Sequence, residues 1–180
     1  MRIIAGQWRG LRLHSPPGTL ARPTTDRVKE SMFNLLGPFA GHEQVVDLFS
    51  GSGALGLEAL SRGARHAVFV DKHPKSIATI RRNIAACAAE DRCTVWQMDW
   101  RAVWPRLTGT RIDWVFVDPP YAHRLWVPVL SAAAQFQPGV DGLVCEHPKE
   151  TELPAQVGPF CVWKTRAYGD IQVTIYTQGS

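Results

Sequence analysis

The sequence contains no long uninterrupted apolar stretch. None of its apolar runs approaches the roughly 18 residues that a membrane-spanning helix requires, which excludes a protein built on such helices. The first residues, Met1 to Gln7, also lack the apolar core and the small-residue cleavage site of a secretory signal peptide. We therefore expect a cytoplasmic protein without a membrane partner.

Cysteine is scarce, with four residues in a chain of 180. The four form no Cys-x-x-Cys pair and have no accompanying His-x-x-x-His pattern, so neither a zinc site nor a disulfide framework is indicated. We interpret them as reduced packing residues and predict that the protein uses no metal.

Net charge is absent outside the first 30 residues. Residues 1–30 hold six basic and two acidic side chains, whereas the other 150 residues hold 14 of each, so the whole excess of +4 lies in this segment. A basic segment on a neutral body suggests contact with a polyanion, because attraction to phosphates dominates nucleic-acid affinity. An ordinary solvated surface has the same composition, and charge alone leaves both interpretations open. Arg9 and Arg12 are the candidate phosphate contacts of this segment.

The chain divides into a basic extension, residues 1–43, and a main domain, residues 44–180. In the extension, the segment 11–14 alternates leucine with Arg12 and His14, which predicts one strand of a small hairpin. Apolar residues at helical spacing then predict a helix that begins at Thr24 and ends before Gly37.

In the main domain, short apolar strands alternate with helices. This alternation predicts a Rossmann-like α/β fold with a mostly parallel seven-stranded sheet covered on both faces. The last two strands have no helix between them and should form an antiparallel hairpin at one sheet edge. The predicted strands are 44–49, 66–71, 93–98, 112–117, 140–146, 160–167 and 170–177, and the predicted helices are 53–63, 74–88, 100–107 and 123–136.

A glycine-rich turn follows the first strand of the main domain. Gly51 and Gly53 permit a tight turn and let a ligand approach bare backbone. Asp71 ends the next strand, 20 residues after Gly51, where its carboxylate can accept both hydroxyls of a ribose. A structural turn with a capping aspartate is the alternative. The candidate cofactor-binding residues of this region are Asp47, Phe49, Ser50, Gly51, Gly53 and Asp71.

The glycines do not distinguish NAD from S-adenosylmethionine. Asp47 lies four residues ahead of Gly51, where a carboxylate would attract the ammonium group of S-adenosylmethionine and repel the pyrophosphate of NAD. This favours S-adenosylmethionine as the cofactor. Asp99 and Trp100, after the third strand, are candidates for contact with the adenine, although Asp99 could instead be a helix cap.

The tetrapeptide Asp118-Pro119-Pro120-Tyr121 follows the fourth strand, where open α/β sheets bind ligands. It suits methylation of an exocyclic amino group, which is a poor nucleophile until its geometry changes. The Asp118 carboxylate and the Pro119 carbonyl can each accept one N–H, and the prolines keep that carbonyl fixed. Tyr121 offers a flat face for an extruded base. A proline turn with a packed tyrosine is the alternative.

The tetrapeptide and the glycine loop together resemble the amino-directed class I methyltransferases. Three further segments are similar to the RsmD family: Arg-Pro-Thr-Thr-Asp-Arg-Val-Lys-Glu at 22–30, Met-Arg-Ile-Ile-Ala-Gly at 1–6 and Tyr-Gly-Asp at 168–170. The resemblance covers nearly the whole chain. It implies a class I S-adenosylmethionine-dependent methyltransferase fold and methylation of a guanine N2 in 16S ribosomal RNA.

The resemblance also implies a partner and further site residues. The partner would be 16S rRNA, within an assembled or partly assembled small ribosomal subunit, and we expect the protein to act as a monomer. Arg22, Thr24 and Arg27 would line the site beside the cofactor and the target base. A helix cap with solvated arginines is the plainer interpretation of those three residues.

Three other functions remain as alternatives. A DNA adenine-N6 or cytosine-N4 methyltransferase could use the same tetrapeptide, but reading DNA usually requires a recognition module larger than this extension. A NAD-dependent oxidoreductase would need another use for Asp118 and Tyr121. A non-catalytic rRNA-binding assembly factor would predict an eroded glycine loop or tetrapeptide, and both are intact.

Overall fold

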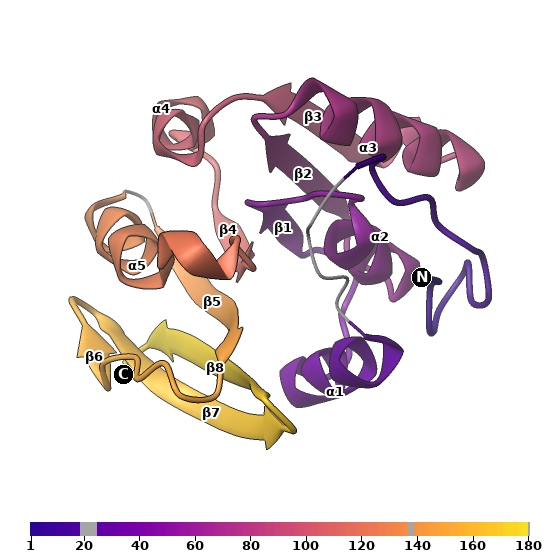
Figure 1. Cartoon of the computed structure of the whole chain (residues 1–180). Coiled ribbons are helices and arrows are strands. Elements are labelled where there is room, and N and C mark those ends of the chain that lie inside the picture. Colours follow the sequence, from indigo (N-terminus) through magenta and orange to yellow (C-terminus); the bar gives the residue numbers. More distant parts are fainter. Residues whose placement is uncertain (19–24, 137–138, 180) are drawn as a thin grey trace.

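A mixed sheet organises the part of the chain that the structure describes, residues 1–18, 25–136 and 139–179 (Figure 1). In this computed structural model the strand order is β3-β2-β1-β4-β5-β8-β7-β6. The first five strands of that order are parallel, and the last three add on in antiparallel fashion. The strands are β1 (Gln44–Asp47), β2 (His66–Asp71), β3 (Cys93–Gln97), β4 (Ile112–Val117), β5 (Val140–Pro148), β6 (Gln156–Val157), β7 (Phe160–Tyr168) and β8 (Ile171–Gln178).

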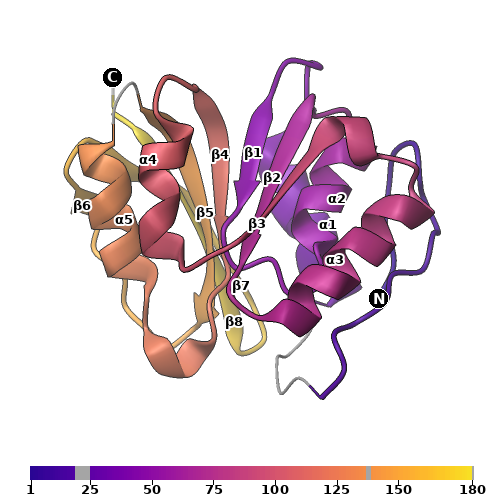
Figure 2. The same ribbon diagram turned by 90° about the horizontal axis from the view of Figure 1, so that it is seen from above.

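Helices cover both faces of the parallel strands, as the alternation of strands and helices predicts (Figure 2). α1, α2 and α3 lie on one face, whereas α4 and α5 lie on the other, and each face has its own apolar cluster. The helices are α1 (Asp26–Leu36), α2 (Ala54–Ser61), α3 (Pro74–Ala86), α4 (Val103–Leu107) and α5 (Trp126–Gln135), with 3-10 turns η1 (Glu90–Arg92), η2 (Trp100–Ala102) and η3 (Tyr121–His123).

The α/β fold class is confirmed. Several predicted elements differ at their ends, and the helix predicted at 100–107 is the 3-10 turn η2 followed by the short helix α4. The structure has eight strands rather than seven, because the two-residue strand β6 pairs with β7 and is too short to leave a sequence pattern. The helix predicted at 123–136 begins only at Trp126, since the 3-10 turn η3 and a left-handed residue, Arg124, come before it.

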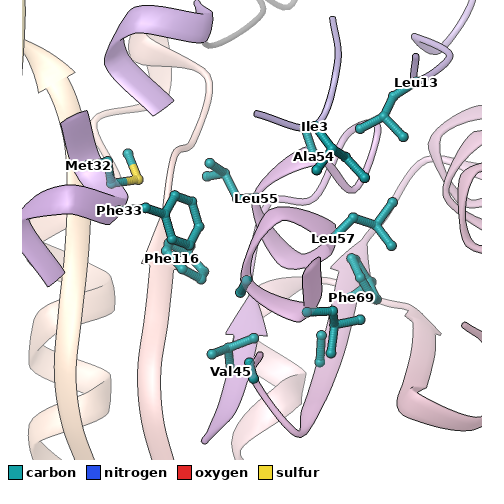
Figure 3. Close-up of a cluster of buried hydrophobic side chains, with 14 of the residues drawn as sticks. Ile3, Leu13, Met32, Phe33, Val45, Ala54, Leu55, Leu57, Phe69 and Phe116 are labelled. Atoms are coloured by element: carbon teal, nitrogen blue, oxygen red, sulfur yellow. The ribbon is translucent and has the colours of Figure 1, made fainter. Parts of the chain in front are cut away.

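The N-terminal extension packs against the main domain. Its two arms pair through an antiparallel bridge between Arg2 and Arg12, with a hydrogen bond from Ile3 N–H to the Leu11 carbonyl oxygen (2.9 Å). Figure 3 shows Ile3 and Leu13 in the same cluster as side chains of α1, α2 and the sheet. The boundary at residue 43 remains a prediction, but residues on both sides of it share this core.

A buried ion pair joins α1 to α2. The Lys29 Nζ lies 3.4 Å from Glu58 Oε1, and the two side chains are 1% and 0% exposed. Lys29 was one of the six basic residues assigned to a polyanion-binding or solvated surface, and for Lys29 this prediction was wrong, because its side chain is buried. Its charge is enclosed by the core, so the accessible excess of the extension is smaller than the sequence indicates.

Candidate cofactor and active site

The glycine loop connects β1 to α2 with its backbone in left-handed conformations. Gly51 and Gly53 have φ angles of 58° and 84°. A Cβ on Gly51 would meet nothing within 4 Å, so the backbone there faces open space that a ligand can approach. A Cβ on Gly56 would lie 2.4 Å from the Phe69 ring, so glycine is required for close packing of α2 on β2.

Asp71, at the end of β2, braces this loop. Its Oδ2 accepts a hydrogen bond from the Gly51 N–H (2.9 Å), and its Oδ1 accepts one from the His73 N–H (2.9 Å). A carboxylate oxygen has further lone pairs, so each oxygen can still accept a hydroxyl. The capping role and the proposed ribose contact are therefore compatible.

Asp47 lies beneath the loop with 2% of its surface exposed. Its Oδ2 accepts a hydrogen bond from the Gly56 N–H at 3.0 Å. Burial, with a smaller contribution from the nearby charge of Asp71, outweighs the lowering effect of that hydrogen bond and raises the pKa of Asp47 to about 7. This carboxylate lies beneath a space that a ligand can approach, so a cation bound there would favour its ionised form.

Ser50 and Phe49, which were also predicted to bind the cofactor, have contacts within the fold. The Ser50 hydroxyl donates to the Asp47 carbonyl oxygen (2.6 Å) and accepts from the Val70 N–H (3.1 Å), which fastens the ends of β1 and β2 together. Phe49 is partly buried against the cluster beneath α4 and α5.

Asp99 and Trp100 are the residues proposed to contact adenine. Asp99 caps the turn η2 by accepting from the Arg101 N–H (2.9 Å), and it also pairs with the Arg101 guanidinium (3.2 Å). Trp100 is 7% exposed, and its indole N–H finds no hydrogen-bond partner in the described part of the chain. The cap therefore exists, while the adenine contact stays a prediction.

These residues fit S-adenosylmethionine. The open backbone at Gly51 leaves room for the ligand, the Asp71 carboxylate can accept ribose hydroxyls, and the buried Asp47 carboxylate suits a cation. A pyrophosphate at the same place would face two carboxylates. The donor and acceptor set therefore matches a cationic nucleoside better than NAD.

The segment Asp118–Tyr121 lies beside this loop because β4 pairs with β1. Asp47 is in register with Phe116, and the Leu48 N–H donates to the Phe116 carbonyl oxygen (3.2 Å). The tetrapeptide thus begins at the strand end next to the glycine loop, at the edge where open α/β sheets bind ligands. Pro119 is buried and Pro120 exposed.

Tyr121 belongs to a cluster of aromatic rings. The centroid of the Tyr121 ring lies 5.8 Å from that of Trp126 in a tilted arrangement, and the Trp126 ring lies 6.1 Å from that of His147, edge to face. The Trp126 indole N–H donates to the Glu146 carbonyl oxygen (2.8 Å), which links α5 to the end of β5. This cluster could not be predicted, because nothing in the sequence spacing of Trp126 and His147 indicates that their side chains meet.

His147 is neutral within this aromatic cluster. Burial lowers its pKa, and its Nδ1 lies 2.9 Å from the Pro148 carbonyl oxygen, which can only accept. Nδ1 therefore carries the proton, and Nε2 accepts from the Thr174 hydroxyl (2.8 Å). His147 is consequently a neutral packing residue of the aromatic cluster and does not donate a proton at neutral pH by ionisation.

The predicted RNA-contact residues are spread over the extension. Arg9 and Arg12 are exposed, and Arg12 lines a cavity of about 440 Å³ with Met1, Arg2, Gly10 and Asp26. Arg9 lies near the turn of the hairpin, where the Gln7 N–H donates to the carbonyl oxygen of Ser61, the last residue of α2 (2.8 Å). Arg9 therefore lies near the C-terminal end of α2, whereas the glycine loop precedes the N-terminal end of that helix.

Of the three residues that the resemblance placed at the site, only one can be located. Arg27 is exposed in the first turn of α1. Arg22 and Thr24 lie outside the described residues. The helix cap is provided by Thr25, whose hydroxyl oxygen accepts from the Val28 N–H (3.3 Å).

The described residues include no helix long and apolar enough to cross a membrane. They also include no group of three or more His, Cys, Asp or Glu side chains placed to hold a metal ion.

Comparison with known proteins identifies the family. A family model described as Conserved hypothetical protein 95 matches residues 1–177. Ribosomal RNA small subunit methyltransferase D of Escherichia coli is 42% identical over 125 residues, which span 69% of this chain and 62% of that protein. The chain belongs to the RsmD family. YlbH of Bacillus subtilis, 40% identical over 182 residues, covers 98% of both chains.

Solved structures agree with this RsmD assignment. The yhhF protein of Escherichia coli superposes with a TM-score of 0.84 at 32% identity, covering 99% of this chain and 97% of that one. An RNA methyltransferase from Salinibacter ruber, solved with S-adenosyl-L-homocysteine, gives a TM-score of 0.66 at 17% identity, covering 88% and 95%. At that identity it shows the fold alone, which is the class I methyltransferase fold.

Proposed function

We propose that the protein transfers a methyl group from S-adenosylmethionine to the exocyclic N2 of a specific guanine in 16S rRNA. Membership of the RsmD family supports an S-adenosylmethionine-dependent methyltransferase acting on rRNA. The observation that carries the proposal is the Asp118–Tyr121 segment at the end of β4, directly beside the glycine loop. The proposed amine acceptors then lie beside the proposed cofactor-binding loop, which supports the proposal.

The proposed catalytic residues act by positioning. The Asp118 carboxylate and the Pro119 carbonyl oxygen accept the two N–H groups of the amine, so that its lone pair points toward the glycine loop. The rigid backbone of Pro119 and Pro120 keeps the acceptor still, and Tyr121 stacks on the base. Bound S-adenosylmethionine would supply the electrophilic methyl group. Asp47, Gly51 and Asp71 would hold it there.

The proposed RNA contacts extend beyond the reacting base. The exposed Arg9 and Arg12 would bind phosphates. Arg22, Thr24 and Arg27 would line the site beside the cofactor and the target base. We propose a small ribosomal subunit, assembled or partly assembled, as the substrate of a monomeric cytoplasmic enzyme. The folded rRNA in such a particle would determine which guanine reaches Tyr121.

A labelling experiment tests this function. The protein is incubated with methyl-labelled S-adenosylmethionine and, in parallel, with unmodified small-subunit particles, naked 16S rRNA or duplex DNA. We expect label on one guanine N2, most efficiently in the particle. Label on DNA adenine N6 or cytosine N4 would replace the proposal with a DNA methyltransferase. Binding of rRNA without any label would indicate an assembly factor.

Cofactor affinity should depend on pH through Asp47. A cation bound above its carboxylate favours the ionised form, which predominates above the pKa of about 7. Titration calorimetry should therefore give roughly five- to tenfold tighter S-adenosylmethionine binding at pH 7.5 than at pH 6, by linkage with a site of that pKa. The Asp47→Asn variant should bind more weakly and show little of this dependence.

The pH dependence of folding stability provides a second test of Asp47→Asn. The folded-state pKa of about 7 lies above the ordinary value of 3.8, so ionisation of Asp47 destabilises the ligand-free fold progressively between those two pH values. Asp47→Asn should then be as stable as the parent near pH 4 and more stable at pH 8. If the affinity of the unsubstituted protein for S-adenosylmethionine did not change between pH 6 and 7.5, the role proposed for Asp47 would be wrong.

A further inference from the structure

Arg124 has an unusual backbone conformation for its residue type. Its φ and ψ angles are 50° and 49°, in the left-handed region that favours glycine. In the described part of the chain Ala88 is the other non-glycine residue with positive φ, and it follows directly on the end of α3, where such residues are common. Arg124 instead follows the reacting segment, and strained residues gather at functional sites.

The turn that carries Arg124 is tied to the reacting residues. The His123 N–H donates to the Pro120 carbonyl oxygen (3.1 Å), and the Arg124 N–H donates to the Tyr121 carbonyl oxygen (3.3 Å). On the other side, the buried Trp126 packs on the Tyr121 ring. The position of Arg124 is therefore fixed relative to Tyr121.

The guanidinium of Arg124 is exposed and has no ion-pair partner among the described residues. Two arginines next to strands of the parallel sheet differ in this respect. Arg101, which follows β3, is paired with Asp99 at 3.2 Å, and Arg111, which precedes β4, is paired with Asp141 at 2.7 Å. Near the end of β4, Arg124 thus presents a positive charge that no described carboxylate neutralises.

We propose that Arg124 binds a backbone phosphate of the RNA next to the target nucleotide. The inference rests on the proposed function: with the base amine at Asp118 and its face on Tyr121, the sugar and phosphates must leave the site toward solvent. Arg124 lies three residues beyond Tyr121 on that exposed turn. A guanidinium binds phosphate oxygens in a bidentate manner, and a fixed backbone reduces the entropy lost on binding.

Substitutions at Arg124 separate its charge from its conformation. Glycine and asparagine both tolerate the left-handed region, so Arg124→Gly and Arg124→Asn should keep the turn and hold or raise the melting temperature. Both should weaken 16S rRNA binding about fivefold or more, and the slope of log affinity against log salt should flatten by about 0.7 to 0.9 for one lost phosphate contact. Arg124→Lys should recover the slope. S-adenosylmethionine affinity should not change.

The matched control is Arg65→Ala, which removes an exposed arginine just before β2, at the opposite end of the strands. It should leave the affinity and the slope as in the parent. The inference is overturned if Arg124→Gly and Arg124→Asn bind 16S rRNA like the parent and Arg65→Ala. Because the readout is RNA binding, that result is distinct from failure of the proposed function, in which the unsubstituted protein places no label on guanine N2.

Discussion

Replacement of Glu58 by alanine is expected to lower the free energy of unfolding by about 3 to 5 kcal/mol, the usual effect of breaking a buried ion pair from one side. Glu58 is fully buried, and its carboxylate accepts from the Ile4 N–H (2.9 Å) and the Ala5 N–H (3.1 Å). It also pairs with Lys29 Nζ (3.4 Å) and Arg62 Nε (2.8 Å). The variant would leave the Lys29 ammonium buried without its carboxylate, although burial already lowers the pKa of Lys29.

Urea unfolding at neutral pH measures this effect, and a double variant tests its cause. In Lys29→Met with Glu58→Gln, the Lys29 charge is removed and the introduced amide oxygen can accept from one of the two backbone N–H groups. Such a replacement should restore part of the stability, since much of the loss comes from the unpaired charge. A loss below about 1 kcal/mol in Glu58→Ala would show that the pair acts like an exposed one.

The parallel half of the fold could be predicted because local pattern and burial agree there. β2 and β4 begin and end at the predicted residues, since each is an apolar run bounded by polar or turn residues. Asp71 and Gly51 could be linked for a similar reason. In a parallel sheet the ends of adjacent strands meet, and the structure joins these two residues by a hydrogen bond of 2.9 Å.

Contacts between distant segments could not be predicted. Lys29 was counted as solvated because a sequence gives its charge but not its partner, and Glu58 becomes that partner only when α1 and the hairpin pack on α2. Trp126 and His147 likewise meet only because α5 packs against the end of β5. Side-chain chemistry is local, whereas burial is a property of the whole fold.

Replacing the carboxylate proposed to bind the cofactor, Asp71, and the one proposed to bind the target amine, Asp118, should have different effects. Asp118→Ala is expected to lower the rate of guanine methylation by about 10² to 10³, the usual effect of removing a preorganised group that acts on the reacting atoms. The affinity for S-adenosylmethionine should change little. Asp71→Ala should instead weaken S-adenosylmethionine by on the order of 1.5 to 3 kcal/mol, because the ribose loses a charged acceptor. Single-turnover rates on small-subunit particles and calorimetric titration separate the two effects.

Variants of Tyr121 complete this test of the reacting site. Tyr121→Phe keeps the ring that contacts Trp126 at 5.8 Å, so its methylation rate should stay near that of the parent. Tyr121→Ala removes the stacking face, worth about 1 to 3 kcal/mol per base, and should lower the rate severely. If Asp118→Ala instead lost cofactor affinity and rate in equal measure, Asp118 would belong to the cofactor site. The amine-positioning role of the tetrapeptide would then be wrong, because nothing else in the segment carries a charged acceptor for the target N–H.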